Sequence, residues 1–533
     1  MRNPLRYRLW YTARQKAVTS VVAGALALTG GWYGFGRLTA PEDRSCAKGV
    51  ERPVGSDECV GVADGGSYDF GQSQLTDVVA AIARENAALK PGTYATVALL
   101  LPLTSTDGAM RTKMQHELQG AFAAQYRANR LSNEQVPKIR LVLANSGRNN
   151  LLWRPAVDRL KTMTGAPDHL RAVSGVATSS TQIKTAVREL TAAHIAVVGT
   201  TITADDIANG PKNDPFPGLA RVSPTNQDEA EALAHFGQRL RPEKALLVQD
   251  TRTGDHYTDT LRTAFTRLVR GTRYQPQLFT SRSDPTDEGN TANTFRDITH
   301  LICDTKDADT VFFAGRHTQL RQFINALGGR GCQDRPFTIL TGDEGSYLGS
   351  DKKLDRNALR QKVTVRYASL AHPDAWATEP GKGNGKGNGK GNGKGEAAAT
   401  GGSPQDYQEF LNLLATVSRA PAGPIGPTGH SDLTDGQIII AHDAMTLAVQ
   451  AVRRASPGGR LPRLADVGEQ WPRMNGSLKV SGAGGWICLD NHGNPYNKAV
   501  PVVELSPEDG RQRFVALAWP KGHPPDATCL PPA

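Results

Sequence analysis

Short apolar runs alternate with amphipathic stretches of helical length over most of the chain, which is the pattern of strands alternating with helices. In the first half we expect strands over Thr96–Leu101, Lys138–Ala144, Ala172–Val176 and Ile195–Val198, and helices over Met110–Asn129, Trp153–Met163 and Gln182–Ala193. Strands that alternate with helices at this spacing predict a parallel sheet with helices on both faces.

The same pattern resumes after residue 222, so a second α/β unit is expected. Its predicted strands are Lys244–Gln249, Thr310–Ala314 and Thr338–Thr341, and its predicted helices are Asn226–Leu240 and Thr258–Val269. Further along the chain we expect a helix over Gln437–Arg454 and short strands around Trp486–Leu489 and Val502–Leu505. Thr225 followed three residues later by Asp228 is typical of a capping box at a helix start. The fold class is therefore α/β, with two such units.

Hydroxyl side chains follow two successive strands of the first unit. Thr178, Ser179 and Ser180 come after one strand, and Thr201 and Thr203 come after the next. Ligands of open parallel sheets sit off the carboxyl ends of the strands, so these loops are the first candidates for a binding site. The plainer interpretation is that the hydroxyls only cap the following helix, and for any single one of them both interpretations stay open.

The amino terminus predicts a membrane segment. Residues 1–16 hold five basic residues and no acid, and Ala17 to Gly36 are uncharged, which is about the length that crosses a bilayer. The basic flank predicts a cytoplasmic amino terminus and an exported remainder, in a single-pass protein of the cell membrane. The alternative is a cleaved signal peptide that ends near Ala25-Leu26-Ala27.

The formal charge of +10 does not predict a nucleic-acid partner. Five of these charges lie in residues 1–16, and a further net three lie in the Gly/Lys/Asn repeat over 381–396, which leaves +2 for the rest of the chain. The rest of the chain is so close to neutral that no dedicated phosphate-binding face is predicted. We expect the repeat to be a flexible, solvated loop.

Six cysteines in an exported chain predict disulfides. Proximity along the chain favours Cys46 with Cys59, Cys303 with Cys332, and Cys488 with Cys529, among the fifteen pairings that six cysteines allow. The spacings do not match a metal site, and no cofactor is predicted. The chain also lacks the HExxH and GxSxG motifs of hydrolases, so an enzyme is not predicted.

The order of several segments resembles the type 1 periplasmic binding proteins, and in particular the branched-chain amino-acid (Leu/Ile/Val) binding proteins of ABC transporters. The segments are VALLLPLT, GVATSSTQ, ARVSPTNQDEAEAL, ALLVQD followed by Tyr257, DTVFFAGRH, LTGDEG and IIIAHDAMTLAVQA, within roughly Tyr94 to Leu505. The resemblance implies two Rossmann-like lobes that are joined by crossover strands and close on a small ligand.

Carried over onto this chain, the resemblance assigns a ligand site between the lobes. Thr178, Ser179 and Ser180 would hold a carboxylate, and Thr201 and Thr203 would bind the same carboxylate and an α-amino group. Tyr257 would face the ligand, Glu344 would pair with its ammonium, and Asp343 matches an acidic position. Zwitterions need donors at one end and an anionic acceptor at the other, which agrees with this division.

Some residues depart from the pattern of the family. The first strand-end loop offers Thr104, Ser105 and Asp107 where relatives have an aromatic residue, and Arg316 and His317 stand where relatives often have tyrosines. If Arg316 faces the cleft, it favours an acidic or otherwise polar ligand; if it faces solvent, it carries no information on the ligand.

The sequence and the resemblance together predict the following segments. They are a cytoplasmic segment 1–16, an anchor 17–36, an extracytoplasmic stalk or entry segment 37–93, a first lobe of 94–220 with 371–455, and a second lobe of 221–370 with 456–533. The leading hypothesis is a membrane-tethered, extracytoplasmic solute-binding protein that captures an amino-acid-like molecule for an ABC permease or a signalling partner. The alternative is an interaction module that keeps the fold without binding a small molecule.

Overall fold

The computed structural model describes residues 12–25, 44–133, 135–237, 241–282, 284, 287–377, 401–418 and 426–532. The chain divides into two units, Met1–Ser45 and Cys46–Ala533. Residues 13–25 of the first unit are helical. No helix within the described ranges is both long enough and apolar enough to span a bilayer. Residues 26–36 of the predicted anchor and the whole repeat over 381–396 lie outside the described residues.

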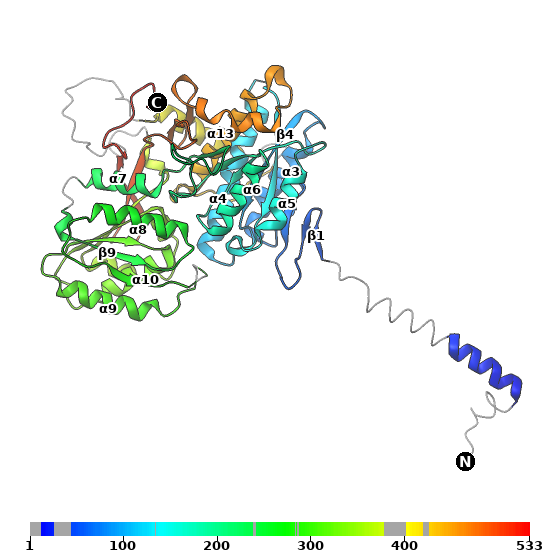
Figure 1. The fold of residues 1–533 in the computed structure, drawn as a ribbon, viewed down its shortest axis with the longest axis horizontal. Coiled ribbons are helices and arrows are strands. Elements are labelled where there is room, and N and C mark those ends of the chain that lie inside the picture. The colour runs from blue at the N-terminus through cyan, green and yellow to red at the C-terminus, as the bar shows by residue number, and fades with distance from the viewer. Residues whose placement is uncertain are drawn as a thin grey trace, which may run out of the picture. The chain divides into compact units, whose positions relative to one another are not determined.

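The second unit contains two lobes, each built on one sheet (Figure 1). The first lobe has an eight-stranded sheet in the order β1-β2-β3-β5-β4-β6-β7-β8. Its strands are β1 (Ser45–Ala47), β2 (Val50–Glu51), β3 (Val60–Ala63), β4 (Tyr94–Leu101), β5 (Lys138–Asn145), β6 (Leu170–Gly175), β7 (Ala196–Gly199) and β8 (Leu219–Arg221). The strands from β4 to β8 run parallel, whereas β3 is antiparallel to β5.

Helices cover both faces of the first sheet, as the strand pattern predicts. The helices of this lobe are α3 (Thr76–Ala87), α4 (Gly108–Tyr126), α5 (Trp153–Thr162), α6 (Thr181–Ala192), α12 (Pro404–Ser418), α13 (Gln437–Arg454) and α14 (Leu464–Gly468). Alternate residues of β4 point to opposite faces. Val97, Leu99 and Leu101 belong to the core under α3, α4 and α13, while Ala98 and Leu100 belong to the core under α5 and α6.

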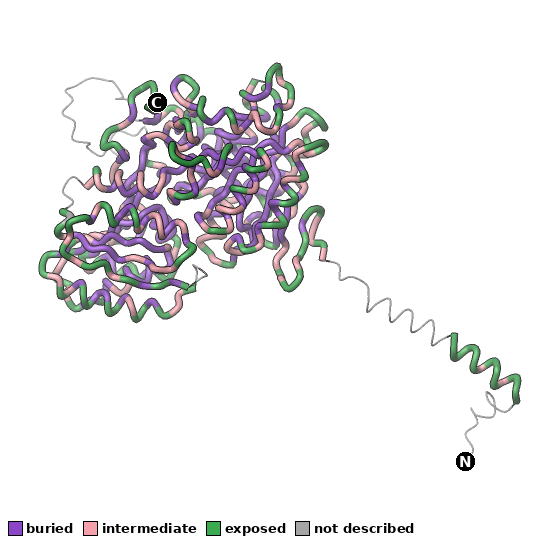
Figure 2. Tube along the Cα trace, in the orientation of Figure 1, coloured by how far each residue is buried: buried purple, intermediate pink, exposed green. Residues whose placement is uncertain are grey.

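The second lobe has a seven-stranded sheet in the order β10-β9-β11-β12-β13-β16-β17. Its strands are β9 (Ala245–Asp250), β10 (Gln277–Phe279), β11 (Thr310–Ala314), β12 (Phe337–Thr341), β13 (Val363–Ala368), β16 (Val500–Leu505) and β17 (Gln512–Ala518). Its helices are α7 (Asn226–Phe236), α8 (His256–Leu268), α9 (Thr291–Asp304), α10 (His317–Gly328) and α11 (Arg356–Arg360). The predicted capping box is present at the start of α7. In both lobes the buried positions follow the central strands (Figure 2).

The chain crosses between the lobes after β8, after β13 and before β16. The third crossing comes later than the predicted boundary at residue 456. The reason is that α14 packs on β6 and β7, and the hairpin of β14 (Val480–Gly482) and β15 (Gly485–Ile487) packs on α13, all in the first lobe. The buried carboxylate of Asp443 on α13 holds this hairpin by accepting the amide hydrogens of Ala483 and Gly484, at 2.7 and 2.8 Å.

The described part of the segment predicted as a stalk or entry segment, residues 44–93, belongs to the first lobe. The strand β3 extends the first sheet by pairing with β5, and α3 buries Val78, Val79 and Ile82 in the core of the lobe. The sequence is polar and glycine-rich here, but short strands at a sheet edge need few apolar residues.

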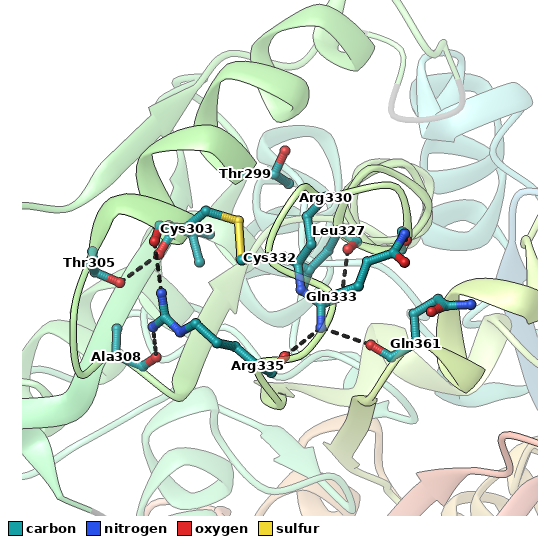
Figure 3. The surroundings of a disulfide bond; sticks show 12 residues. Thr299, Cys303, Thr305, Ala308, Leu327, Arg330, Cys332, Gln333, Arg335 and Gln361 are labelled. Atoms are coloured by element: carbon teal, nitrogen blue, oxygen red, sulfur yellow. Dashed lines mark hydrogen bonds between the residues drawn. A yellow bond between two sulfur atoms is a disulfide. The ribbon is translucent and has the colours of Figure 1, made fainter.

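All three disulfides join the cysteines that proximity favours, namely Cys46–Cys59, Cys303–Cys332 and Cys488–Cys529. The second of them ties the end of α9 to the loop that follows α10 (Figure 3). Next to it, Arg335 donates hydrogen bonds of 2.8 Å to the carbonyls of Cys303 and Ala308. This region therefore fixes the loops before β11 and β12, at the opposite ends of the strands from the candidate site.

Candidate functional site

The strand-end loops of the two lobes meet, and the predicted site residues lie where they meet. Ser180 of the first lobe forms an isolated β-bridge with Asp255 of the second. The guanidinium of Arg316 donates to the carbonyl of Ser179 at 3.4 Å, and the Thr203 hydroxyl donates to Asp343 at 3.4 Å. Residues from β6, β7, β9, β11 and β12 are thus brought to one place between the lobes.

Arg316 is the centre of the second lobe's part of the site. It follows β11 and donates to both oxygens of Asp255, at 2.7 and 2.9 Å, and to Oε1 of Glu344 at 2.7 Å. Its side chain is only 11% exposed, and the guanidinium lies 4.7 Å from the ring centroid of Tyr257. Of the two orientations that the sequence leaves open, the structure has Arg316 buried between the lobes and not facing solvent.

Glu344 is ionised and fully engaged within its own lobe. Its Oε2 accepts the backbone N–H of His317 at 3.0 Å and lies 2.7 Å from Nδ1 of the same residue. Burial alone would raise the pKa of Glu344, but Arg316 and His317 outweigh burial and hold the pKa well below its ordinary value.

The aromatic rings of Tyr257 and Tyr347 are buried in this region. Tyr257 is buried at the start of α8, and its hydroxyl oxygen accepts the backbone N–H of Glu344 at 3.4 Å. The ring of Tyr347 lies 4.8 Å from the ring of His317 and 5.6 Å from the ammonium nitrogen of Lys113. The site therefore combines charged groups with two buried aromatic rings.

Lys113 on α4 is the centre of the first lobe's part. Its side chain is 3% exposed, and its Nζ donates to the carbonyl of Ala177 at 2.9 Å and to the hydroxyl oxygen of Thr201 at 2.8 Å. Burial lowers the pKa of Lys113, while Glu117, Asp343 and Glu344 oppose that effect. The resemblance assigned Thr201 to a ligand, but in this structure its hydroxyl binds the ammonium of Lys113.

The hydroxyls after β6 have separate roles. Ser180 caps α6, accepting the N–H of Ile183 at 3.3 Å, and Thr178 accepts a hydrogen bond of 2.6 Å from Asn150. The hydroxyl of Ser179 accepts the N–H of Ala204 at 3.2 Å and so joins the two strand-end loops of the first lobe. The capping interpretation is thus confirmed for Ser180.

The first strand-end loop takes no part in this network. Asp107 caps α4 by accepting the N–H of Met110 at 2.8 Å, and Thr104 donates to Glu58 at 2.5 Å. These polar residues hold their own loop in place of the aromatic residue that relatives have there.

Two further acids, Glu229 and Asp343, are buried near Glu344. The carboxylate of Glu229 accepts the backbone N–H of Asp343 at 3.1 Å. Burial, reinforced by Glu344, raises the pKa of Asp343 to about 7, although Lys113 and Arg316 oppose the rise. Burial, reinforced by Asp343, also raises the pKa of Glu229 well above its ordinary value. Both carboxyl groups therefore hold a proton to higher pH than a free carboxyl group does.

Several central residues were not among the predicted ones, notably Lys113, Glu117, Glu229 and Asp255. The sequence could have indicated Lys113 and Glu117, because they share the helix face that also carries Met114, Leu118 and Ala121. A charged pair on the apolar face of a helix has to find polar partners in the fold. Within the described residues no group of three or more His, Cys, Asp or Glu side chains could hold a metal ion.

No protein-family model matches the chain, and no curated protein matches its sequence. Solved structures do match. A substrate-binding protein of an ABC transporter from Desulfitobacterium hafniense, in complex with Leu, has a TM-score of 0.52 at 14% identity, over 79% of this chain and 99% of that one. A leucine-binding protein from Thermotoga maritima gives 0.53 at 15% identity, over 80% and 99%.

A third similar structure is a solute-binding protein of an ABC transporter from R. palustris in complex with 4-hydroxybenzoate. It has a TM-score of 0.50 at 14% identity, over 80% of this chain and 96% of that one. At these identities the likeness concerns the fold. The chain therefore has the two-lobed fold of the type 1 periplasmic binding proteins, the fold of the leucine and branched-chain amino-acid binding proteins of ABC transporters.

Proposed function

We propose that this chain is an extracytoplasmic solute-binding protein whose two lobes close on a small polar molecule. The observation that carries the proposal is the convergence of polar strand ends from both lobes on one buried place, with Arg316 and Glu344 on one side and Lys113 and Thr201 on the other. Strand ends that face each other across a hinge are a common place for a ligand. The activity is binding and not catalysis, in keeping with the similar solved structures.

The distribution of hydrogen bonds supports lobes that can separate. The short bonds of Arg316 and of Lys113 stay within their own lobes. The bonds that cross at the centre, from Arg316 to Ser179 and from Thr203 to Asp343, are 3.4 Å long. At the rim, Nδ1 of His256 lies 2.6 Å from Asp206. Opening would break these contacts between the lobes and leave the short hydrogen bonds of Arg316 and of Lys113 intact.

The proposal includes export and a tether. Disulfides persist in oxidising compartments, which supports an extracytoplasmic body. The uncharged stretch from Ala17 to Gly36, preceded by basic residues, supports a single-pass anchor with a cytoplasmic amino terminus. An ABC permease or a signalling protein would receive the bound solute. Protease protection of the amino terminus in intact cells tests the topology.

Binding is tested by isothermal titration of the purified full-length chain against amino acids and amine-free carboxylic acids. The proposal predicts saturable binding of one solute per chain for at least one of these classes. The matched variants are Thr201→Val, which is expected to weaken binding, and Thr162→Val on the outer helix α5, which is expected to leave it unchanged. If no solute of either class binds to folded protein, the proposal is wrong.

The second candidate is an interaction module without a small-molecule ligand. It is favoured by the mutual satisfaction of the charged groups, because both oxygens of Asp255 and both of Glu344 are already hydrogen-bonded. A module of this kind would keep one separation between its lobes whatever solute is added. A solute-dependent change in that separation would exclude it.

A further inference from the structure

The ammonium group of Lys113 is buried where the two lobes meet. In the described part of the chain its ammonium group makes two hydrogen bonds, to Ala177 and Thr201, whereas an ammonium carries three donors. The nearest carboxylate oxygen with which it forms an ion pair, Oε1 of Glu117, is 3.9 Å away and beyond hydrogen-bond reach. Lys113 is thus a buried cation with no hydrogen-bonded anion.

The position of Lys113 does not depend on closure of the lobes. Ala177 and Thr201 both belong to strand-end loops of the first lobe, as does α4 itself. The Thr201 hydroxyl also donates to the Ala177 carbonyl at 2.7 Å, which fixes the oxygen that receives Lys113. The ammonium group is therefore already in place when a solute enters the open cleft.

The carboxylates of Glu344 and Asp255, whose oxygens are all hydrogen-bonded, are occupied by donors of the protein. In the second lobe Arg316 and His317 bind Glu344, while Arg316 and Arg252 bind Asp255. In the first lobe Lys113 binds Ala177 and Thr201, and among the described residues Oε1 of Glu117, 3.9 Å from Lys113, has no hydrogen-bond partner. A zwitterionic amino acid that used Glu344 or Asp255 would have to displace a donor of the protein, and a buried charge that loses its partner is costly.

In contrast, an anionic group of the solute would find a donor of Lys113 that has no hydrogen-bonded anion. A solute carboxylate beside Lys113 would supply the missing hydrogen-bonded anion, and a charge-assisted bond of this kind is stronger than a neutral one. The ring of Tyr347 lies 5.6 Å from the same ammonium and would lie next to the rest of the solute.

We propose that Lys113 sets the specificity of the cleft, which takes a small carboxylic acid that carries no amino group. This inference rests on the proposed solute-binding function and deepens it. The carboxylate binds the ammonium of Lys113 on the first lobe, and the body of the acid lies toward Tyr347 on the second. An amino group at the α position is disfavoured because Arg316 and His317 already bind Glu344, the acid to which the resemblance assigns the ammonium.

The test is isothermal titration of the full-length chain with matched pairs of acids that differ only at the α position. The pairs are lactate with alanine, 2-hydroxyisocaproate with leucine, and phenyllactate with phenylalanine, with benzoate as an acid that has no α substituent. Wild-type protein is expected to bind at least one amine-free acid about tenfold or more tighter than its amino partner. This comparison needs no variant and does not depend on whether a mutant folds.

Variants then identify the residue responsible. Lys113→Met is expected to weaken binding of the amine-free acid by about a hundredfold and to remove the preference over the amino partner. Lys161→Met, on the outer helix α5, is the matched control and is expected to change neither. Equal or tighter binding of the amino acids by wild-type protein overturns this inference and leaves the solute-binding function standing. An unchanged preference in folded Lys113→Met also overturns it, and failure of every acid to bind overturns both.

Discussion

At the scale of single residues, the site depends on how buried charges are paired. Arg316 neutralises two carboxylates at once, and this pairing keeps Glu344 ionised despite its burial. The same pairing explains why an arginine can stand between the lobes, since a guanidinium can bind two carboxylates through separate donors. The charges at the centre of the molecule are therefore interdependent.

Removal of Arg316 is expected to be strongly destabilising. In Arg316→Met, Asp255 and Glu344 lose their buried cation, and breaking a buried pair in this way costs about 3–5 kcal/mol. Urea unfolding of the full-length chain measures the change. Arg154→Met is the control, because Arg154 is 60% exposed in its pair with Glu189, and such surface pairs contribute less than about 1 kcal/mol. Equal stabilities for both variants would contradict the pairing described for Arg316.

The protonation of Asp343 predicts how stability depends on pH. Its folded-state pKa of about 7 lies above the ordinary value of 3.8, so its contribution is fully present below pH 3.8 and is lost as the pH rises through about 7. A pKa raised by even one unit is worth about 1.4 kcal/mol. We expect the free energy of unfolding to fall between pH 5 and pH 8.

The matched variant for this dependence is Asp343→Asn, which keeps the shape and cannot titrate. Its free energy of unfolding is expected to vary less between pH 5 and pH 8 than that of wild type. Some dependence remains, because burial also raises the pKa of Asp205, to about 6. Identical profiles for the variant and wild type would show that Asp343 does not titrate in this range.

At the scale of secondary structure, the sequence predicts the central strands and helices well. The strands that became β4, β5 and β11 were located within two residues, because each is a continuous apolar run bounded by polar residues. The short strands β1 to β3 were missed, since two to four residues carry no periodic signal. The resemblance identified Glu344 and Thr201 as site residues but not their partners, because Lys113 and Asp255 meet them only through tertiary packing.

The disulfide between Cys303 and Cys332 is expected to support the second lobe without affecting the site. The two cysteines are 29 residues apart in the sequence. A cross-link of this kind adds about 2–4 kcal/mol to the free energy of unfolding, an effect that is usually attributed to restriction of the unfolded chain. Cys303→Ala/Cys332→Ala should lose this amount in urea unfolding. Because the disulfide lies before β11 and β12 and the site lies after them, solute affinity should remain unchanged. A loss of affinity without a loss of stability would contradict this separation of roles.

At the scale of the whole molecule, two pre-organised half-sites face each other across three crossings of the chain. Each half keeps its strong hydrogen bonds within its lobe, and the central bonds between the lobes are long. Opening would leave the hydrogen bonds within each half-site intact, and closing would add contacts to a solute. The equilibrium between open and closed forms is then set by differential affinity for the solute.

The most direct measurement is the distance between the lobes, followed by fluorescence energy transfer. All six native cysteines are in disulfides, so cysteines introduced at the exposed positions Asp158 on α5 and Asn293 on α9 can be labelled selectively. Protein stripped of solute is expected to show a change in transfer efficiency when a binding acid is added, and Lys113→Met is expected to need far more acid for the same change. One constant efficiency, unaffected by stripping or by any acid, would contradict a clamp that closes on a solute.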